Sequence, residues 1–337
     1  MKAAIFKGPN ELFVDNFDLP KLESNQVLIK VDLCGVCGTD FHIFSGEAPS
    51  KVPVIPGHEY VGIVADFGIS VKGISVGDHV AIDPNIYCGQ CYYCRRGEVN
   101  FCLNLKALGV TLNGGFAEYS IVPSSQVYII PNNLPFRTAA FAEPLSCCIH
   151  GADQAEIKIG ESVVIIGGGT IGLMMMQLAI ISGAGKVILI EPVISKRETA
   201  KILGADFTFD SNSNELYSQI AEVTSGGPDV IIECVGKSEA VNLALNLSKK
   251  GGRLIVFGLS GKKESISINL QNFFHKELSI KGSLLNPYTF ARSIEILAGN
   301  KINIEPFNPL QFKLDNLSDV LKGTRDFSVI KYQVSPN

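Results

Sequence analysis

Residues 163–176 read VVIIGGGTIGLMMM, an apolar run that leads through a G-x-G-x-x-G pattern into a second apolar run. In such a pattern the first glycine permits a tight turn, the second lets the backbone approach a pyrophosphate, and the third allows close helix packing. The helix start then offers unpaired N–H groups to the phosphates. The pattern predicts a dinucleotide-binding strand, turn and helix, with an ordinary tight turn as the alternative. The residues expected to bind the cofactor are Gly167, Gly169, Thr170, Ile171 and Gly172.

The next apolar run, KVILIE, ends at Glu191, which lies about 20 residues beyond the turn, as the acidic residue of a dinucleotide site does. A carboxylate there accepts a hydrogen bond from the ribose 2′-hydroxyl and repels a 2′-phosphate. This position therefore predicts NAD as the cofactor in preference to NADP. Lys196 is close enough in the sequence to reach the same ribose, and a solvated charge on a helix surface is the equal alternative.

Strand and helix signals alternate from Glu161 onward, and the runs PDVIIECVG and RLIVFGL continue the pattern. Such alternation indicates βαβ units on a parallel sheet. The first 145 residues instead contain short β-branched runs broken by Gly, Pro and Asn, which predict many short strands in a barrel-like body. We expect a two-domain α/β protein, because 337 residues are many for one core. The β-rich domain would comprise residues 1–145 and 286–337, and the Rossmann domain residues 146–285.

Four of the nine cysteines lie in the segment CGQCYYCRRGEVNFC. Thiolates at this spacing can surround one tetrahedral zinc ion, and a closed set of four leaves no position for a substrate. The segment therefore predicts a structural zinc; disulfides and an iron–sulfur cluster are the alternatives. The expected ligands are Cys88, Cys91, Cys94 and Cys102.

Composition excludes several classes of function. The net charge of −4 and the lack of a basic stripe give no reason to expect nucleic-acid binding. The start MKAAIFKGPNELFV has no signal-peptide core, and the longest apolar run is too short to cross a membrane. We expect a cytoplasmic protein with no membrane association, in which free cysteines stay reduced.

A second set of potential metal ligands is spread over three segments. LCGVCGTDFH contains Cys37, GHEYVG contains His58 and Glu59, and FAEPLSCCIHG contains Glu143. A thiolate, an imidazole and a carboxylate provide three protein ligands and leave a position open for water or an alcohol, as in a catalytic zinc site. Each residue alone is weak evidence, since a histidine before a glutamate is more often a satisfied polar pair. Together they predict a second zinc ion.

These motifs, with GGFAEY and GGGTIG, resemble those of the zinc-dependent medium-chain dehydrogenases that act on alcohols, polyols and threonine. The resemblance covers nearly the whole chain. It implies a GroES-like β-rich catalytic domain beside a Rossmann domain. It also implies reversible oxidation of an alcohol by NAD, with two zinc ions per chain.

The resemblance also implies residue roles. Cys37 and His58 match zinc ligands of the family, whereas the third ligand could be Glu59 or Glu143. Thr39 matches the hydroxyl that accepts a hydrogen bond from the alcohol, and His42 matches the residue that passes the proton to solvent. The remaining matches are Asp40, which would orient His58, and Val235 and Leu259, which would line the nicotinamide pocket.

The sorbitol dehydrogenases are among the families that the chain resembles, but two positions differ from them. Leu285 replaces an arginine and Ile43 replaces a tyrosine, so we expect a substrate other than sorbitol. Another polyol, an inositol-like ring, a sugar-alcohol phosphate, a secondary alcohol and L-threonine stay open. The intact ligand set argues against a non-catalytic member of the family. The family also implies a homo-oligomer, for which we expect a tetramer, with a dimer as the alternative.

Overall fold

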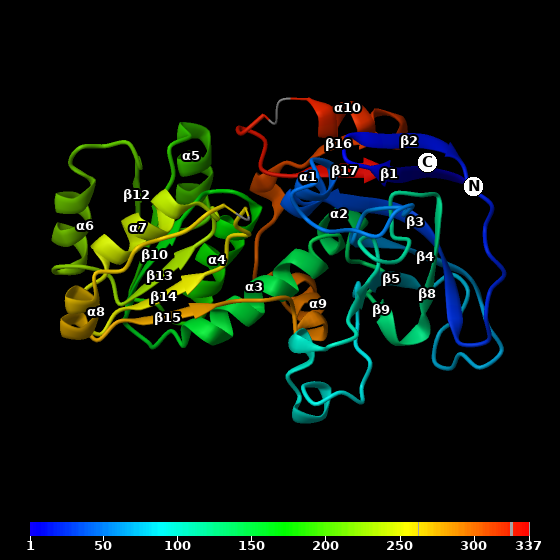
Figure 1. Ribbon diagram of the computed structural model, residues 1–337, viewed down its shortest axis with the longest axis horizontal. Coiled ribbons are helices and arrows are strands. Elements are labelled where there is room, and N and C mark those ends of the chain that lie inside the picture. The colour runs from blue at the N-terminus through cyan, green and yellow to red at the C-terminus, as the bar shows by residue number, and fades with distance from the viewer. Residues whose placement is uncertain (262, 324–325, 337) are drawn as a thin grey trace. The chain divides into compact units, whose positions relative to one another are not determined.

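The structure is a computed structural model that describes residues 1–261, 263–323 and 326–336. It divides into two compact units (Figure 1). The first comprises residues 1–146, 287–300 and 309–337, and the second comprises residues 147–286 and 301–308. No helix in the described ranges is long and apolar enough to span a lipid bilayer.

The first unit is built mainly from short strands. Its main sheet has seven strands in the order β16-β17-β3-β4-β5-β9, with β8 paired to β3. These strands are β3 (Gln26–Val36), β4 (Glu59–Phe67), β5 (His79–Ile82), β8 (Tyr119–Pro123), β9 (Val127–Ile129), β16 (Leu310–Lys313) and β17 (Tyr332–Ser335). Two small antiparallel sheets consist of β1 (Lys2–Gly8) with β2 (Glu11–Asn16), and β6 (Asn85–Ile86) with β7 (Lys106–Ala107).

Short helices connect these strands. They are α1 (Gly38–Phe44), α2 (Phe136–Ala139), α9 (Phe290–Ala298) and α10 (Leu317–Lys322), with the 3₁₀ turns η1 (Cys94–Arg96), η2 (Val99–Phe101), η3 (Ser124–Gln126) and η5 (Leu314–Asn316). Helix α3 (Ala142–Ala155) begins in this unit and continues into the second.

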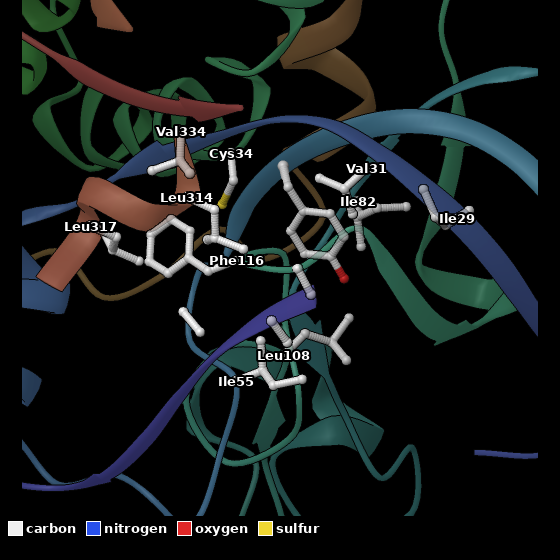
Figure 2. Close-up of a cluster of buried hydrophobic side chains, with 14 of the residues drawn as sticks. Ile29, Val31, Cys34, Ile55, Ile82, Leu108, Phe116, Leu314, Leu317 and Val334 are labelled. Atoms are coloured by element: carbon white, nitrogen blue, oxygen red, sulfur yellow. The ribbon is translucent and has the colours of Figure 1, made fainter. Parts of the chain in front are cut away.

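The core of the first unit brings together residues from both ends of the chain. Figure 2 shows the Phe116 ring with Leu314, Leu317 and Val334 close by. All four side chains are at most 1 % exposed. The C-terminal segment is therefore an integral part of this core, and β17 pairs with β3 in antiparallel fashion, with Gln333 opposite Gly35.

The second unit contains a parallel sheet of six strands in the order β12-β11-β10-β13-β14-β15. The order reverses between β10 and β13, as in the doubly wound dinucleotide-binding folds, whose ligands bind beyond the carboxyl ends of the strands there. The strands are β10 (Ser162–Ile166), β11 (Lys186–Ile190), β12 (Phe207–Phe209), β13 (Val230–Glu233), β14 (Arg253–Val256) and β15 (Ser279–Gly282).

The helices of the second unit alternate with its strands (Figure 1). They are α4 (Thr170–Ile181), α5 (Ile194–Ile202), α6 (Leu216–Thr224), α7 (Ser238–Leu247) and α8 (Leu270–Lys276), with the 3₁₀ turn η4 (Glu305–Phe307). Residues on β10, such as Val164 and Ile166, are almost fully buried, because helices and neighbouring strands cover them. The expected combination of a β-rich domain and a Rossmann sheet is confirmed.

Candidate functional site

Cys37, His58 and Glu59 lie together in the first unit. Cys37 directly follows β3, and His58 directly precedes β4, whose first residue is Glu59. The register pairs Gly35 with Glu59, so the end of one strand lies beside the start of the other. One donor atom from each of the three ligand candidates lies within 4.8 Å of the other two. A single antiparallel strand pair, β3 with β4, thus brings these three residues together although about 20 positions separate Cys37 from the other two in the sequence.

His58 is held beside a buried carboxylate. Its Nδ1 lies 3.6 Å from Asp40 Oδ1, and Asp40 Oδ2 accepts a hydrogen bond of 2.8 Å from the Cys37 backbone N–H. Neither His58 Nδ1 nor Asp40 Oδ1 has a hydrogen-bond partner in the described part of the chain. Asp40 thus faces the Nδ1 side of the ring as an electrostatic partner without a hydrogen bond.

The electrostatics of this cluster favour a cation. Burial lowers the pKa of His58, but the charge of Asp40 and the Cys37 thiol outweigh it and raise the pKa well above its usual value. Burial has the opposite effect on Asp40 and raises the pKa of its carboxyl group. The site thus combines a sulfur donor, an imidazole nitrogen and carboxylate oxygens, with negative charge around the imidazole. This combination fits a zinc ion with three protein ligands.

Glu143 lies near this group without joining it. It is in the first turn of α3 and 8 % exposed, and it is not among the donors that lie within 4.8 Å of one another. Burial raises its pKa to about 7, and the negative charges of Glu59 and Asp83 add to this effect. The structure thus places Glu59 in one group of mutually close donor atoms with Cys37 and His58 and leaves Glu143 outside that group, although the charge of Glu143 still acts on His58.

A buried lysine, which the sequence did not single out, completes the cluster. Lys331 Nζ donates to Glu59 Oε2, and the two side chains are 4 % and 1 % exposed. Lysine is almost never fully buried unless it is paired, so its place in the apolar run FSVIKYQV was the available signal.

The two proposed proton-handling residues lie on α1. Thr39 Oγ1 is 3.6 Å from Cys37 Sγ. His42 is one turn further along the helix, with its Nδ1 2.6 Å from Glu47 Oε2 and a third of its side chain exposed. The helix therefore carries these groups from the buried ligand cluster toward solvent.

The four cysteines at 88–102 also form one group. Their sulfur atoms all lie within 4.8 Å of one another, and all nine cysteines of the chain are free. Gly89 and Gly97 have φ angles of +70° and +80°, which glycine tolerates and which let the chain wrap around the centre. Backbone N–H groups of Gln90 and Cys91 lower the pKa of Cys88 to about 6, which favours the thiolate form that a metal needs.

The glycine turn has the geometry of a phosphate site. Gly167 has φ +102°, and a Cβ at Gly172 would lie 1.8 Å from the Gly167 carbonyl oxygen, so neither position accepts a side chain. A Cβ at Gly169 would meet nothing within 4 Å. Gly169 is the N-cap of α4, which begins at Thr170 and continues through Ile171 and Gly172. The helix start is thus open to an approaching anion.

Glu191 lies directly beside this turn. Its Oε2 accepts a hydrogen bond of 2.6 Å from Gly168 N–H, and its Oε1 accepts one of 2.9 Å from Val193 N–H. Arg197 Nη1 donates to the carbonyls of Glu191 and Pro192, and the guanidinium also pairs with Asp210. Lys196 on α5 is 8 % exposed and is not a solvated surface charge.

Val235 and Leu259 follow β13 and β14 and are 43 % and 55 % exposed. A Cβ at Gly167 would lie 2.9 Å from Val235 Cγ2, so Val235 borders the glycine turn. A second residue that the sequence did not single out, Glu233, fixes this loop. Its buried Oε1 accepts hydrogen bonds of 2.6 and 2.8 Å from the N–H groups of Val235 and Gly236.

Two family profiles match the chain. The alcohol dehydrogenase GroES-like domain matches residues 23–132, and the zinc-binding dehydrogenase family matches residues 170–299. D-arabinitol dehydrogenase 1 of Uromyces fabae is 35 % identical over 341 residues, which cover 100 % of this chain and 97 % of that protein. D-arabitol-phosphate dehydrogenase of Enterococcus avium is 32 % identical and is matched over 98 % of this chain and 95 % of its own.

A solved structure is also similar over its full length. It is that of a protein of Sinorhizobium meliloti 1021 assigned to the zinc-binding dehydrogenases and bound to NADP. The TM-score is 0.96 with 39 % identity, over 99 % of each chain.

Proposed function

This chain belongs to the zinc-type medium-chain dehydrogenases, and from that premise we propose that it interconverts a polyol or secondary alcohol and its ketone by hydride transfer. The reaction uses a nicotinamide dinucleotide held at the glycine turn. The relatives named for arabinitol and arabitol phosphate favour a polyol as the substrate. We assign catalysis to residues 1–145 with 286–337, and cofactor binding to residues 146–285.

The observation that carries the proposal is the convergence of Cys37, His58 and Glu59, whose donor atoms lie within 4.8 Å of one another. Three protein ligands of this kind leave one position for a substrate oxygen. We place a zinc ion here and a second, structural one among Cys88, Cys91, Cys94 and Cys102. The protein thus holds two zinc ions per chain.

The reaction divides between the bound groups and the protein's own residues. A zinc ion in such a site acts as a Lewis acid toward the alcohol, and the dinucleotide accepts the hydride. Asp40, which faces His58 Nδ1 at 3.6 Å, orients the ring electrostatically. Thr39 Oγ1 takes the proton of the substrate hydroxyl as it gives up its own, and His42, which is a third exposed and paired with Glu47, releases a proton to solvent. The transfer follows one helix, α1, from the buried cluster outward.

We propose NAD as the physiological cofactor. The Glu191 carboxylate beside the turn accepts hydrogen bonds from the ribose hydroxyls and repels a 2′-phosphate. Arg197 on α5 is engaged with the carbonyls of Glu191 and Pro192 and with the carboxylate of Asp210. Thr170, Ile171, Lys196, Val235 and Leu259 complete the cofactor site. The NADP in the similar Sinorhizobium structure makes this preference the first point to test.

We further expect a homotetramer in the cytoplasm, whose reducing conditions fit the nine free cysteines. Leu285, where sorbitol dehydrogenases have an arginine, keeps sorbitol itself an unfavourable substrate.

The test is a screen of polyols, polyol phosphates, secondary alcohols and L-threonine with NAD and with NADP, followed by the absorbance of the reduced cofactor. We expect a polyol to give the highest kcat/KM, with NAD preferred. Highest activity on L-threonine would assign the chain to the other branch of the family, and no activity on any alcohol would refute the proposal.

A further inference from the structure

Lys331 is a buried cation to which the proposed reaction gives no role. It lies just before β17, is 4 % exposed, and donates through Nζ to Oε2 of Glu59. Burial of a lone ammonium group costs roughly several kcal/mol, so a buried lysine needs a partner of opposite charge that offsets this cost. The pair joins residues 272 positions apart in the sequence.

The fold reserves space for this pair. β17, β3 and β4 are adjacent, with Gln333 opposite Gly35 and Gly35 opposite Glu59. A Cβ at Gly35 would lie 2.2 Å from Glu59 Oε2 and 2.9 Å from Lys331 Cε. The absence of a side chain at position 35 therefore lets the lysine reach the carboxylate across the middle strand.

The ion pair also bears on which carboxylate oxygen of Glu59 can bind a metal ion. Oε2 accepts the hydrogen bond of Lys331, so the carboxylate still has its other oxygen, Oε1, to offer to an ion at Cys37 and His58. A carboxylate ligand held by an outer hydrogen bond is fixed in orientation, and loss of such a partner typically lowers metal affinity about 10- to 100-fold.

Charge points in the same direction. The cluster contains the thiol of Cys37 and the carboxyl groups of Asp40, Glu59 and Glu143, all of which act electrostatically on His58 or Lys331. A divalent ion alone would leave negative charge in a buried site. The ammonium of Lys331 offsets part of it, through its hydrogen bond to Glu59 and, electrostatically, on Glu143 as well.

We propose that Lys331 is a positioning residue that selects Glu59 over Glu143 as the third protein ligand of the zinc ion, by holding Oε2 and directing Oε1 at the metal. The proposal rests on the proposed function, because it assumes zinc at Cys37 and His58.

The experiment compares Lys331→Met, which keeps length and removes charge, with the conservative Lys331→Arg. The matched control is Lys249→Met, which removes the ion pair with Asp229 in the other unit. The readouts are the rate of zinc release to excess EDTA and the visible spectrum of the cobalt-substituted protein. We expect Lys331→Met to release one of its two zinc ions about 10- to 100-fold faster and to change the cobalt spectrum. Lys331→Arg and Lys249→Met should resemble the wild type.

Glu59→Gln provides a second comparison. If Lys331 acts through Glu59, adding Lys331→Met to Glu59→Gln should change zinc release no further. Wild-type zinc release and an unchanged cobalt spectrum in Lys331→Met would overturn the proposal.

A crystal structure of the zinc-loaded wild type decides the matter without a variant, should Lys331→Met fail to fold. It should show zinc on Glu59 Oε1 with Lys331 on Oε2; zinc on Glu143 with Glu59 released would overturn the proposal. A wild type that lacks zinc at Cys37 altogether would instead refute the proposed function.

Discussion

Replacement of Glu191 by glutamine should change cofactor preference. The two side chains have the same size, and the amide oxygen of Gln can still accept a hydrogen bond from Gly168 N–H or Val193 N–H. The substitution therefore removes the negative charge and keeps one of these two hydrogen bonds. Alanine would be a poorer choice, because it would leave both N–H groups without their acceptor.

The expected magnitude follows from the contacts that the charge makes. A hydrogen bond to a charged acceptor contributes about 1.5–3 kcal/mol and one to a neutral acceptor about 0.5–1.5 kcal/mol. Loss of roughly 1.5 kcal/mol at the ribose weakens NAD binding about tenfold. Removal of the repulsion on a 2′-phosphate strengthens NADP binding by about tenfold or more, since two charges near a protein surface at 4 Å interact by about 4 kcal/mol. The preference for NAD should fall about 100-fold.

Fluorescence titration with NADH and NADPH measures both affinities directly, and kcat/KM with each oxidised cofactor gives an independent ratio. Glu198→Gln is the matched control, because Glu198 lies on the same helix, α5, and is exposed. An unchanged ratio in Glu191→Gln, or a wild type that already prefers NADPH, would refute the role of Glu191.

Three further outcomes test other parts of the structure. Gly172→Ala should weaken NADH binding by about tenfold or more without loss of zinc, because the new Cβ would lie 1.8 Å from the Gly167 carbonyl oxygen and displace α4; unaltered affinity by fluorescence titration would contradict this packing. Cys91→Ser should lose one zinc ion and lower the midpoint of thermal unfolding, since a closed four-thiolate site contributes folding energy; full zinc content would show that these cysteines bind no metal. Asp229→Asn should lower the free energy of unfolding by roughly 1–3 kcal/mol at neutral pH. Burial raises the pKa of Asp229, but Lys249 and Ser162 outweigh it and hold the pKa below its usual value. The carboxylate thus stabilises the fold above its unfolded pKa, and the difference between variant and wild type should disappear as the pH falls through the lower folded pKa. Urea unfolding over a pH series measures this, and a difference that persists in acid would contradict it.

Local sequence signals predicted most of the Rossmann sheet. ESVVIIGGG became β10 and its turn, KVILIE became β11 with Glu191 one residue beyond it, and PDVIIECVG became β13. Each is a parallel strand that is buried except for Lys186 at the start of β11, and such strands read as nearly continuous apolar runs. β15 was less apparent, because its sequence SIKG is short, polar and only partly buried.

The residue types of the ligand candidates were predictable from the sequence, but which glutamate lies with Cys37 and His58 was not. The family resemblance left Glu59 and Glu143 as equal candidates, whereas the strand pair β3–β4 brings Glu59 beside Cys37. Lys331 could not be assigned to this cluster from sequence, because its contact depends on β17 pairing with β3. Non-local pairing of this kind has no signature in a local pattern.

The central claim is that zinc held by Cys37, His58 and Glu59 is required for NAD-linked oxidation of a polyol. Zinc analysis and activity of Cys37→Ser test it together, with Cys147→Ser as control for loss of a cysteine outside both metal groups. We expect two zinc ions per chain in the wild type and the control, and one zinc ion with no activity in Cys37→Ser. Retained polyol oxidation in Cys37→Ser, or an unchanged zinc content, would contradict the account.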